Sequence, residues 1–215
     1  MKVAVCVEAQ PSRAALGATA LATGLVGADV WWVHVGSAAM DVSQVPQEIS
    51  GVMSLVAPEL ENAHSSSMAV ALAAVIARLG CALVLCGVRS DAEGTGLIGA
   101  ALAVQMERIY IAQVSGLSWI TGRKHVETDV ALDGQVVRLR VELPAVLTCV
   151  PVASAVGATR VARQHKILSL QDVRIDPATM RKASAWVSNP VPQPRPKSVK
   201  DAAAFMHAIT KRQGS

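Results

Sequence analysis

Small residues that leave room for a ligand follow a continuous apolar run, and this combination is suited to binding an anion. The run Cys81 to Cys86 has the length and composition of a strand buried on both faces of a parallel sheet. Four small residues come after it: Gly94, Thr95, Gly96 and Gly99. They open a helix predicted from about Gly96 to Met106, and a helix N-terminus attracts anions through its backbone N–H groups and its dipole. The segment therefore predicts a phosphate-binding loop beyond the carboxyl end of a parallel strand.

The glycine spacing admits two interpretations. Gly94-x-Gly96-x-x-Gly99 matches the G-x-G-x-x-G fingerprint of dinucleotide-binding proteins, but the acidic residue expected about 20 positions later is not convincingly present. No Gly-Lys-Ser or Gly-Lys-Thr follows, so the segment is not a P-loop. The alternative is that these glycines only let a helix pack closely against a strand. Both interpretations stay open at this point.

The other residues with reactive side chains form no catalytic or metal-binding pattern. The five histidines do not have the spacing of metal ligands. They are His34, His64, His125, His165 and His207. No nucleophile elbow is present, and Asp91 and Glu93 are expected to hold a ribose or cap a helix rather than act as an acid-base pair. The cysteines lie in strand-like runs without a C-x-x-C pair: Cys6, Cys81, Cys86 and Cys149. We therefore expect reduced, packed thiols and a cytoplasmic location.

Alternation of strand and helix patterns dominates the first half of the chain. Strands are predicted at 2–8, 30–35, 81–86 and 109–114, and helices at 14–27, 46–56, 64–79 and 96–106. Such β-α-β alternation predicts a mostly parallel, doubly wound sheet of the α/β class. With 215 residues, 52% of them hydrophobic, the chain can bury one large core, predicted over residues 1–188. The longest apolar stretches are too short to span a bilayer, and the first residues do not resemble a secretory signal.

The second half changes character. Predicted strands 125–132 and 136–143 flank Asp133-Gly134, a strong signal for a two-residue hairpin turn. In the second of these strands apolar residues alternate with mostly polar ones, which predicts one buried face carrying Val137, Leu139, Val141 and Leu143. A further buried strand is predicted at 145–150.

Charge divides unevenly along the chain. Residues 1–159 carry 9 basic and 13 acidic side chains, whereas residues 160–215 carry 11 basic and 3 acidic ones. Few aromatic residues accompany the basic ones, which argues against single-stranded nucleic acid as a partner. Residues 189–215 are predicted to form a Pro-rich spacer and a short amphipathic helix at 198–211, which would need a surface to dock on. That surface is either the chain's own domain or a partner.

The order of these motifs resembles the small (beta) subunit of electron transfer flavoproteins. The resemblance rests on Gly87-Val88-Arg89-Ser90-Asp91, Thr95 to Gly99, the Asp133-Gly134 hairpin and Leu143 to Thr148, and it covers nearly the whole chain. It implies an adenine-nucleotide α-hydrolase-like fold and a heterodimer in which an alpha-type partner holds the main FAD. It also implies a C-terminal arm that embraces that partner, and a flavin dehydrogenase as electron donor.

The resemblance also implies a nucleotide site in this chain, holding AMP or a second FAD. The residues carried over are Glu8, Ala9, Gly36, Gly87, Val88, Asp91, Gly94, Thr95, Gly96 and Leu97. Leu97 and Gly94 depart from the family pattern, and the segment 149–166 is shorter than usual, so an empty site and a different dehydrogenase stay open. The expected role is that of an electron carrier, not an enzyme. The alternative is a stand-alone adenine-nucleotide sensor or stress-type α/β protein without flavin.

Overall fold

The computed structural model describes residues 1–43, 45–88, 96–151 and 159–180. The predicted spacer and helix of residues 189–215 lie outside this part, as do Asp91, Gly94 and Thr95. Within the described residues, no helix is long and apolar enough to cross a membrane.

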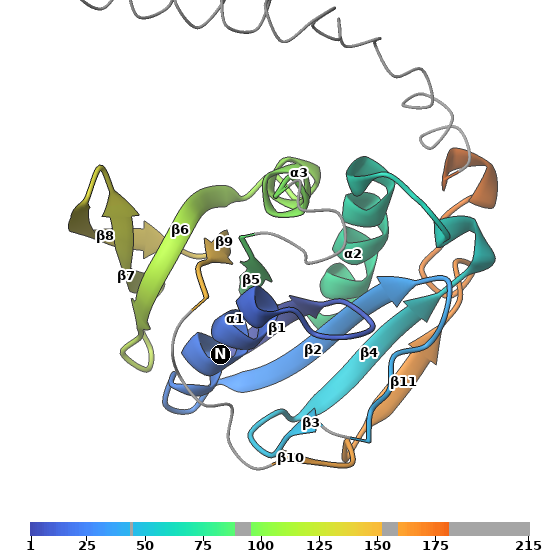
Figure 1. The fold of residues 1–215 in the computed structure, drawn as a ribbon, viewed down its shortest axis with the longest axis horizontal. Coiled ribbons are helices and arrows are strands. Elements are labelled where there is room, and N and C mark those ends of the chain that lie inside the picture. Colours follow the sequence, from blue (N-terminus) through green and yellow to red (C-terminus); the bar gives the residue numbers. More distant parts are fainter. Residues whose placement is uncertain (44, 89–95, 152–158, 181–215) are drawn as a thin grey trace, which may run out of the picture. The chain divides into compact units, whose positions relative to one another are not determined.

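A nine-stranded sheet organises the described residues, in the order β11-β4-β2-β1-β5-β9-β6-β7-β8. Neighbours from β11 to β6 pair in parallel, and only the contacts of β6 with β7 and of β7 with β8 are antiparallel. The strands are β1 (Lys2–Val7), β2 (Asp29–Gly36), β4 (Gly51–Val56), β5 (Leu83–Gly87), β6 (Ile109–Ser118), β7 (His125–Leu132), β8 (Gln135–Glu142), β9 (Ala145–Cys149) and β11 (His165–Leu168). This arrangement confirms the predicted α/β class with its mostly parallel sheet and antiparallel hairpin (Figure 1).

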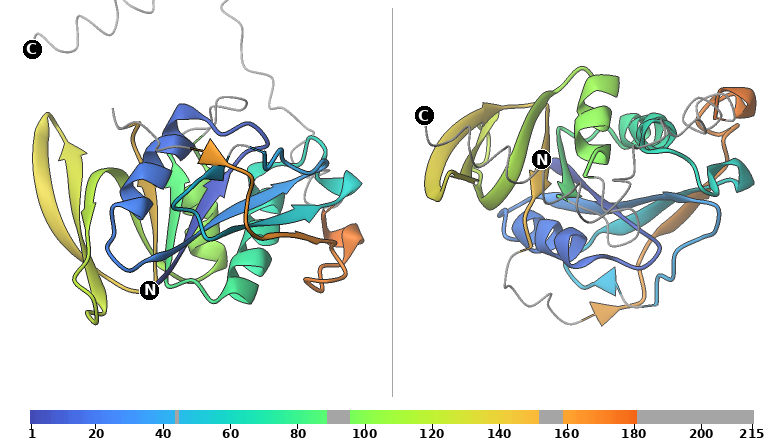
Figure 2. Two further views of the ribbon diagram at one scale, coloured as in Figure 1. Left: turned by 90° about the horizontal axis from the view of Figure 1, so that it is seen from below. Right: turned by 45° about the horizontal axis from the view of Figure 1, so that its top comes forward.

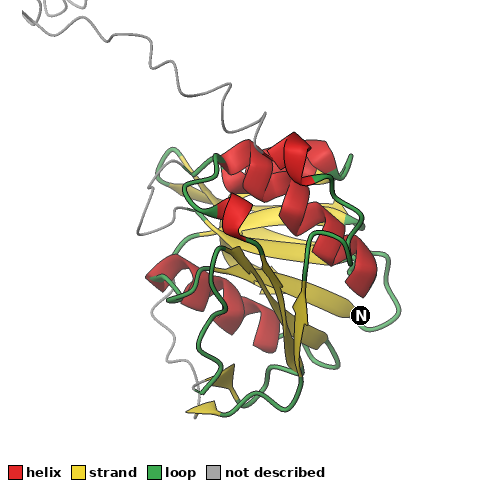
Figure 3. Ribbon diagram, turned by 90° about the vertical axis from the view of Figure 1, so that its right-hand side faces the viewer, coloured by secondary structure: helices red, strands yellow, loops and turns green. Residues whose placement is uncertain are grey.

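Helices cover both faces of the sheet. Helix α1 (Arg13–Thr23) lies on one face, and α2 (Ser65–Leu79) and α3 (Ile98–Gln105) lie together on the other (Figures 2 and 3). A single 3₁₀ turn, η1 (Pro58–Leu60), precedes α2. Two apolar clusters result, one under α2 and α3 and one under α1. Strands β1, β5 and β9 are apolar on both faces because each face has its own cluster to fill.

Neighbouring tryptophans in β2 show how the two clusters share one strand. Trp31 packs against the cluster under α2, whereas Trp32 is buried in the cluster under α1 and donates a 3.0 Å hydrogen bond from Nε1 to Thr19 Oγ1. Successive side chains of a strand point to opposite faces, so the two neighbouring tryptophans reach different clusters.

The predicted helix at 46–56 is wrong. This segment instead forms β3 (Val45–Pro46) and β4, and β3 pairs with β10 (Thr159–Arg160) in a small antiparallel sheet. Strand β4 hydrogen-bonds to β2 on one side and to β11 on the other, and its side chains fill both clusters. Because both faces are apolar, the segment lacks the alternation that marks a half-buried strand.

The β7–β8 hairpin forms around the predicted turn. Asp133 and Gly134 adopt φ values of 48° and 78°, the left-handed pair that a two-residue type I′ turn requires. The expected buried face of β8 is only partly present: Val141 is buried, but Val137 is 37% exposed. The buried contact therefore lies at the base of the hairpin, and its tip is exposed on both faces.

Candidate functional site

A pocket of about 390 Å³ opens at the carboxyl ends of β1, β2 and β5. Strand β1 lies between the other two, and the chain runs from β1 outward to β2 and β4 before it returns through α2 to β5 on the far side of β1. In open parallel sheets, ligands bind at such a reversal of strand order. The pocket volume falls in the range of small-molecule sites, roughly 300–1,000 Å³.

The pocket is lined by both apolar and polar side chains. Its apolar side chains come mainly from the segment before α2, from α2 itself and from the start of α3: Leu60, Met68, Leu72 and Ile98, with Val35 from β2. Its charged side chains among the described residues are the carboxylates of Glu8 and Glu61. Walls of this kind suit a flat, largely apolar group with a few hydroxyl or amino groups at its edge.

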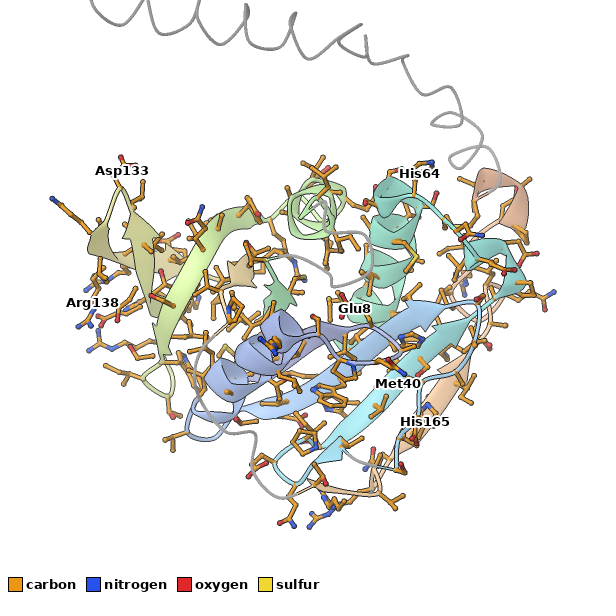
Figure 4. The ribbon with its side chains drawn as sticks, viewed as in Figure 1. Glu8, Met40, His64, Asp133, Arg138 and His165 are labelled. Carbon is orange, nitrogen blue, oxygen red and sulfur yellow. The ribbon has the colours of Figure 1, made fainter. Side chains whose placement is uncertain are left out.

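Glu8 connects the end of β1 to the start of α1 (Figure 4). Its Oε2 accepts a 3.1 Å hydrogen bond from the Ser12 N–H. Ser12 is the N-cap of α1, and its Oγ accepts a 3.2 Å hydrogen bond from the Ala15 N–H. The two side chains thus satisfy backbone donors at a helix end that faces the pocket.

His34 fixes the loop that follows β2. The ring is 2% exposed, with Nδ1 at 3.3 Å from the Val7 carbonyl oxygen and Nε2 at 3.0 Å from that of Ala38. These contacts tie the loop to the end of β1 and so shape one wall of the pocket. Gly36 leaves space for the ring, since a Cβ there would lie 3.1 Å from His34 Nε2.

Two thiols line the pocket. Cys6 and Cys86 lie on the paired strands β1 and β5, and both line the cavity. Hydrogen bonding to Cys86, together with burial, raises the pKa of Cys6 well above its ordinary value of 9.0. A thiol that stays protonated is a poor nucleophile, which argues against nucleophilic chemistry at Cys6.

The structure brings together five of the residues predicted to bind a cofactor. Glu8, Ala9, Gly36, Gly87 and Gly96 all line the pocket.

Two of the other predicted positions, Val88 and Leu97, lie away from the pocket. The Val88 N–H donates a 2.9 Å hydrogen bond to the Cys149 carbonyl, and Leu97 is 58% exposed at the N-cap of α3. Neither of them lines the pocket. Asp91, Gly94 and Thr95 fall outside the described residues, so their part in the loop stays a prediction.

Gly99 and Gly87 have packing roles. A Cβ at Gly99 would collide with Thr148 Cγ2 on β9, and a Cβ at Gly87 would lie 2.8 Å from Ala14 Cβ on α1. Close helix-strand approach therefore explains Gly99, the last glycine of the G-x-G-x-x-G spacing. Gly96 differs, because it adopts a φ of 66° and lies at the pocket.

Several pocket residues escape prediction from the sequence. His34, Ser12 and Cys6 line the pocket without belonging to any motif. The one signal that could have found them is position, since His34 and Cys6 stand near the carboxyl ends of predicted parallel strands and Ser12 precedes a predicted helix.

Comparison with known proteins adds one finding. The family model for the electron transfer flavoprotein domain matches residues 4–173. A comparison with curated proteins finds no match. The matched range contains every residue of the pocket.

Proposed function

Because the chain belongs to the electron transfer flavoprotein family, we propose that it is the small, beta-type subunit of a heterodimeric electron carrier. Members of this family are flavin-associated electron carriers rather than enzymes. In this proposal an alpha-type subunit holds the main FAD, and the complex takes electrons from a flavin dehydrogenase and passes them to an acceptor. The chain itself binds an adenine nucleotide, AMP or a second FAD.

The observation that carries the nucleotide proposal is the pocket at the reversal of strand order. Its apolar walls at Leu72 and Ile98 fit a purine base, and the Glu8 carboxylate fits a ribose, whose hydroxyls are hydrogen-bond donors. Backbone at Gly96 is free of a side chain and faces the same cavity. These residues would hold the nucleoside part of the ligand.

The chain's own contribution is to bind and position. The flavin supplies the redox chemistry when it is bound, as in other cofactor-dependent proteins. Within the described residues, the Cys6 thiol, whose pKa is raised, and a buried histidine that contacts backbone carbonyls border the pocket. The nucleotide would join β1, β2, β5 and α3 and so stabilise the subunit by the free energy of binding.

The deciding experiment is to express the chain together with an alpha-type subunit, purify the complex and denature it. The released small molecules are then identified by mass spectrometry and absorbance. FAD with AMP supports the proposed carrier, and two FAD per complex supports the variant with a flavin in both subunits. A colourless homodimer that releases only an adenine nucleotide would contradict electron transfer and favour a nucleotide sensor.

Replacing Gly96 with alanine tests the pocket itself. Its φ of 66° disfavours any residue with a Cβ, and the strained backbone lines the cavity. We expect the co-purified nucleotide to fall by about tenfold, equivalent to ~1.4 kcal/mol of lost contacts. Gly122→Ala is the matched control, because Gly122 adopts a φ of 86° with open space around it. Equal nucleotide content in both variants would contradict a role for Gly96 in binding.

A further inference from the structure

We propose that protonation of His34 controls how firmly the loop 37–39 is held at the pocket. The ring holds this loop through hydrogen bonds from both nitrogens when it carries two protons, and loses one of these bonds when it carries one. The inference goes beyond the proposed nucleotide site, because it concerns contacts within the chain itself. It follows from the chemical type of the two partners of His34 and from the burial of its ring.

Both partners of the His34 ring are backbone carbonyl oxygens, which only accept hydrogen bonds. Nδ1 lies 3.3 Å from the Val7 oxygen, and Nε2 lies 3.0 Å from the Ala38 oxygen. A neutral imidazole has one N–H, so it donates to one of these oxygens while its other nitrogen turns a lone pair towards the second. An imidazolium ring donates to both. The two hydrogen bonds are therefore made together only by the doubly protonated ring.

The surroundings of the ring give a missing hydrogen bond no ready substitute. The ring is 2% exposed, so water has little access to its nitrogens. Gly36 packs against it closely enough that a Cβ there would lie 3.1 Å from Nε2 and 3.2 Å from Cε1. A buried polar atom without a partner is unfavourable. Loss of one proton therefore favours separation of one carbonyl from the ring.

The contact with the loop is the one that is free to open. Val7 belongs to the central part of the sheet and pairs in register with His34 itself. Residues 37–39 are exposed, and the first two of them line the pocket. Met40, buried in the cluster under α1, holds the far end of the loop. Opening would therefore move the pocket wall and leave the sheet in place.

Charged groups on the neighbouring elements act in both directions. Glu8 and Glu61 line the pocket together with the ring, and Asp41 follows the loop. These carboxylates favour a positively charged ring. Strand β4, which pairs with β2, has no ionisable side chain. The opposing groups are Arg13 at the start of α1 and His165 on β11.

His165 provides a comparison within the same sheet (Figure 4). Its Nε2 lies 3.1 Å from Ser54 Oγ. A hydroxyl group can donate or accept, so this hydrogen bond can form in either protonation state of the ring. We therefore expect protonation to change the contacts of His34 and to leave that of His165 in place.

The test is NMR spectroscopy of the full-length chain with isotope-labelled histidine, in its complex if the partner is needed for solubility. The nitrogen shifts of each ring are followed between about pH 8 and 5, the range in which histidine ordinarily changes charge. As the pH falls, we expect His34 to gain a proton so that both nitrogens carry one. Over the same interval, amide exchange at residues 37–39, relative to the rate in unstructured peptides, should slow by about fivefold to tenfold, as one added hydrogen bond implies. A constant protonation state of His34, in either form, would overturn the inference.

His34→Gln supplies a side-chain amide that can donate to a carbonyl oxygen and does not titrate. In this variant the protection of residues 37–39 should no longer depend on pH. The matched control, His165→Gln, should keep the pH dependence of the unaltered chain. Equal pH dependence in His34→Gln and the unaltered chain would show that another group holds the loop, and would overturn the inference. If His34→Gln does not fold, the nitrogen shifts and loop exchange of the unaltered chain decide the question.

Discussion

Gly99 shows how one missing side chain sets the distance between a helix and a strand. A Cβ at this position would collide with Thr148 Cγ2 and lie 3.4 Å from Tyr110 Cε2. Alanine at Gly99 gains up to about 1 kcal/mol in helix propensity, but overpacking costs roughly 1–3 kcal/mol. We expect the clash to dominate, so Gly99→Ala should lower the free energy of unfolding in urea titrations by about 1–2 kcal/mol.

The cause is identified by a second substitution. Thr148→Ser removes the colliding methyl group and keeps the hydroxyl that lies 3.2 Å from the Tyr110 hydroxyl. Gly99→Ala should therefore cost less in the Thr148→Ser background, with a coupling energy of about 1 kcal/mol. Strictly additive effects would show that the glycine is not required by packing against Thr148.

Cys81 should make the free energy of unfolding fall as the pH rises above about 9. Burial raises its thiol pKa from 9.0 to about 11. Between these values the unfolded thiol ionises and the folded one does not, so the stabilisation present below about pH 9 is lost as the pH rises towards 11. The loss should be on the order of 1–2 kcal/mol.

Urea titrations between about pH 8 and 11, with reductant present, measure this effect. Cys81→Ala should flatten the decline in the free energy of unfolding, whatever its effect on stability at neutral pH. A decline of equal steepness in the variant and the unaltered chain would show that Cys81 does not contribute.

What the sequence reveals about single residues depends on whether their role is local. The Asp133-Gly134 turn is predictable, because positive φ at both positions is a property of the turn itself. The role of His34 is not predictable from the sequence, because its contacts with Val7 and Ala38 depend on which strands become neighbours. Gly99 stays ambiguous in the sequence for the same reason, since its contact with Thr148 crosses 49 positions (148 minus 99) of chain.

The β7–β8 hairpin is anchored at its base and free at its tip. Val126, near the base, is fully buried in the cluster under α1, whereas Val136, next to the turn, is 69% exposed. Val126→Ala should lower the free energy of unfolding by about 2 kcal/mol through lost burial and an unfilled cavity. Val136→Ala is the matched control and should change it by less than about 0.5 kcal/mol.

Thermal or urea unfolding of the two variants checks this prediction. Both lose the same two methyl groups and the same strand propensity, so only burial distinguishes them. Equal destabilisation would show that the tip of the hairpin contributes to the core as much as its base does.

Strands β4 and β8 show where hydrophobic patterns mislead the prediction of strands. Strand β4 is buried between β2 and β11, and its mostly apolar sequence lacks the alternation of a half-buried strand. Conversely, the alternation in β8 predicted a buried face that is completed only near Val141, because the strand lies at the edge of the sheet and extends beyond the helices. Periodicity reports the contrast between two faces, and it does not report how far a neighbouring layer reaches.

The order of the strands in the sheet could not be predicted from the sequence. Alternation of strand and helix predicted a parallel sheet, but β9 inserts between β5 and β6 after the chain has passed through the β7–β8 hairpin. Hydrophobic patterns mark which strands are buried and carry no record of their neighbours. The position of the pocket could not be predicted from these patterns either, because the pocket is formed where the neighbouring strands β1, β2 and β5 end together.

The segment 190–215 is predicted to bind the partner and to contribute little to the stability of the α/β domain. Its Pro-rich start favours an extended spacer, and a helix of the length of 198–211 is marginal without a surface to dock on. Deleting residues 190–215 should therefore leave the urea unfolding midpoint of the chain nearly unchanged. The same deletion should abolish co-elution with an alpha-type subunit in size-exclusion chromatography.

Point substitutions separate the loss of a docking helix from the loss of chain length. Helical spacing places Phe205 and Ile209 on one predicted apolar stripe and Lys200 on the opposite side. Phe205→Glu should prevent complex formation, because it puts a charge on the stripe, whereas Lys200→Glu should leave the complex intact. If the deletion variant still co-elutes with its partner, the segment does not hold the heterodimer together. If the deletion instead lowers the unfolding midpoint of the isolated chain, the helix docks on its own domain.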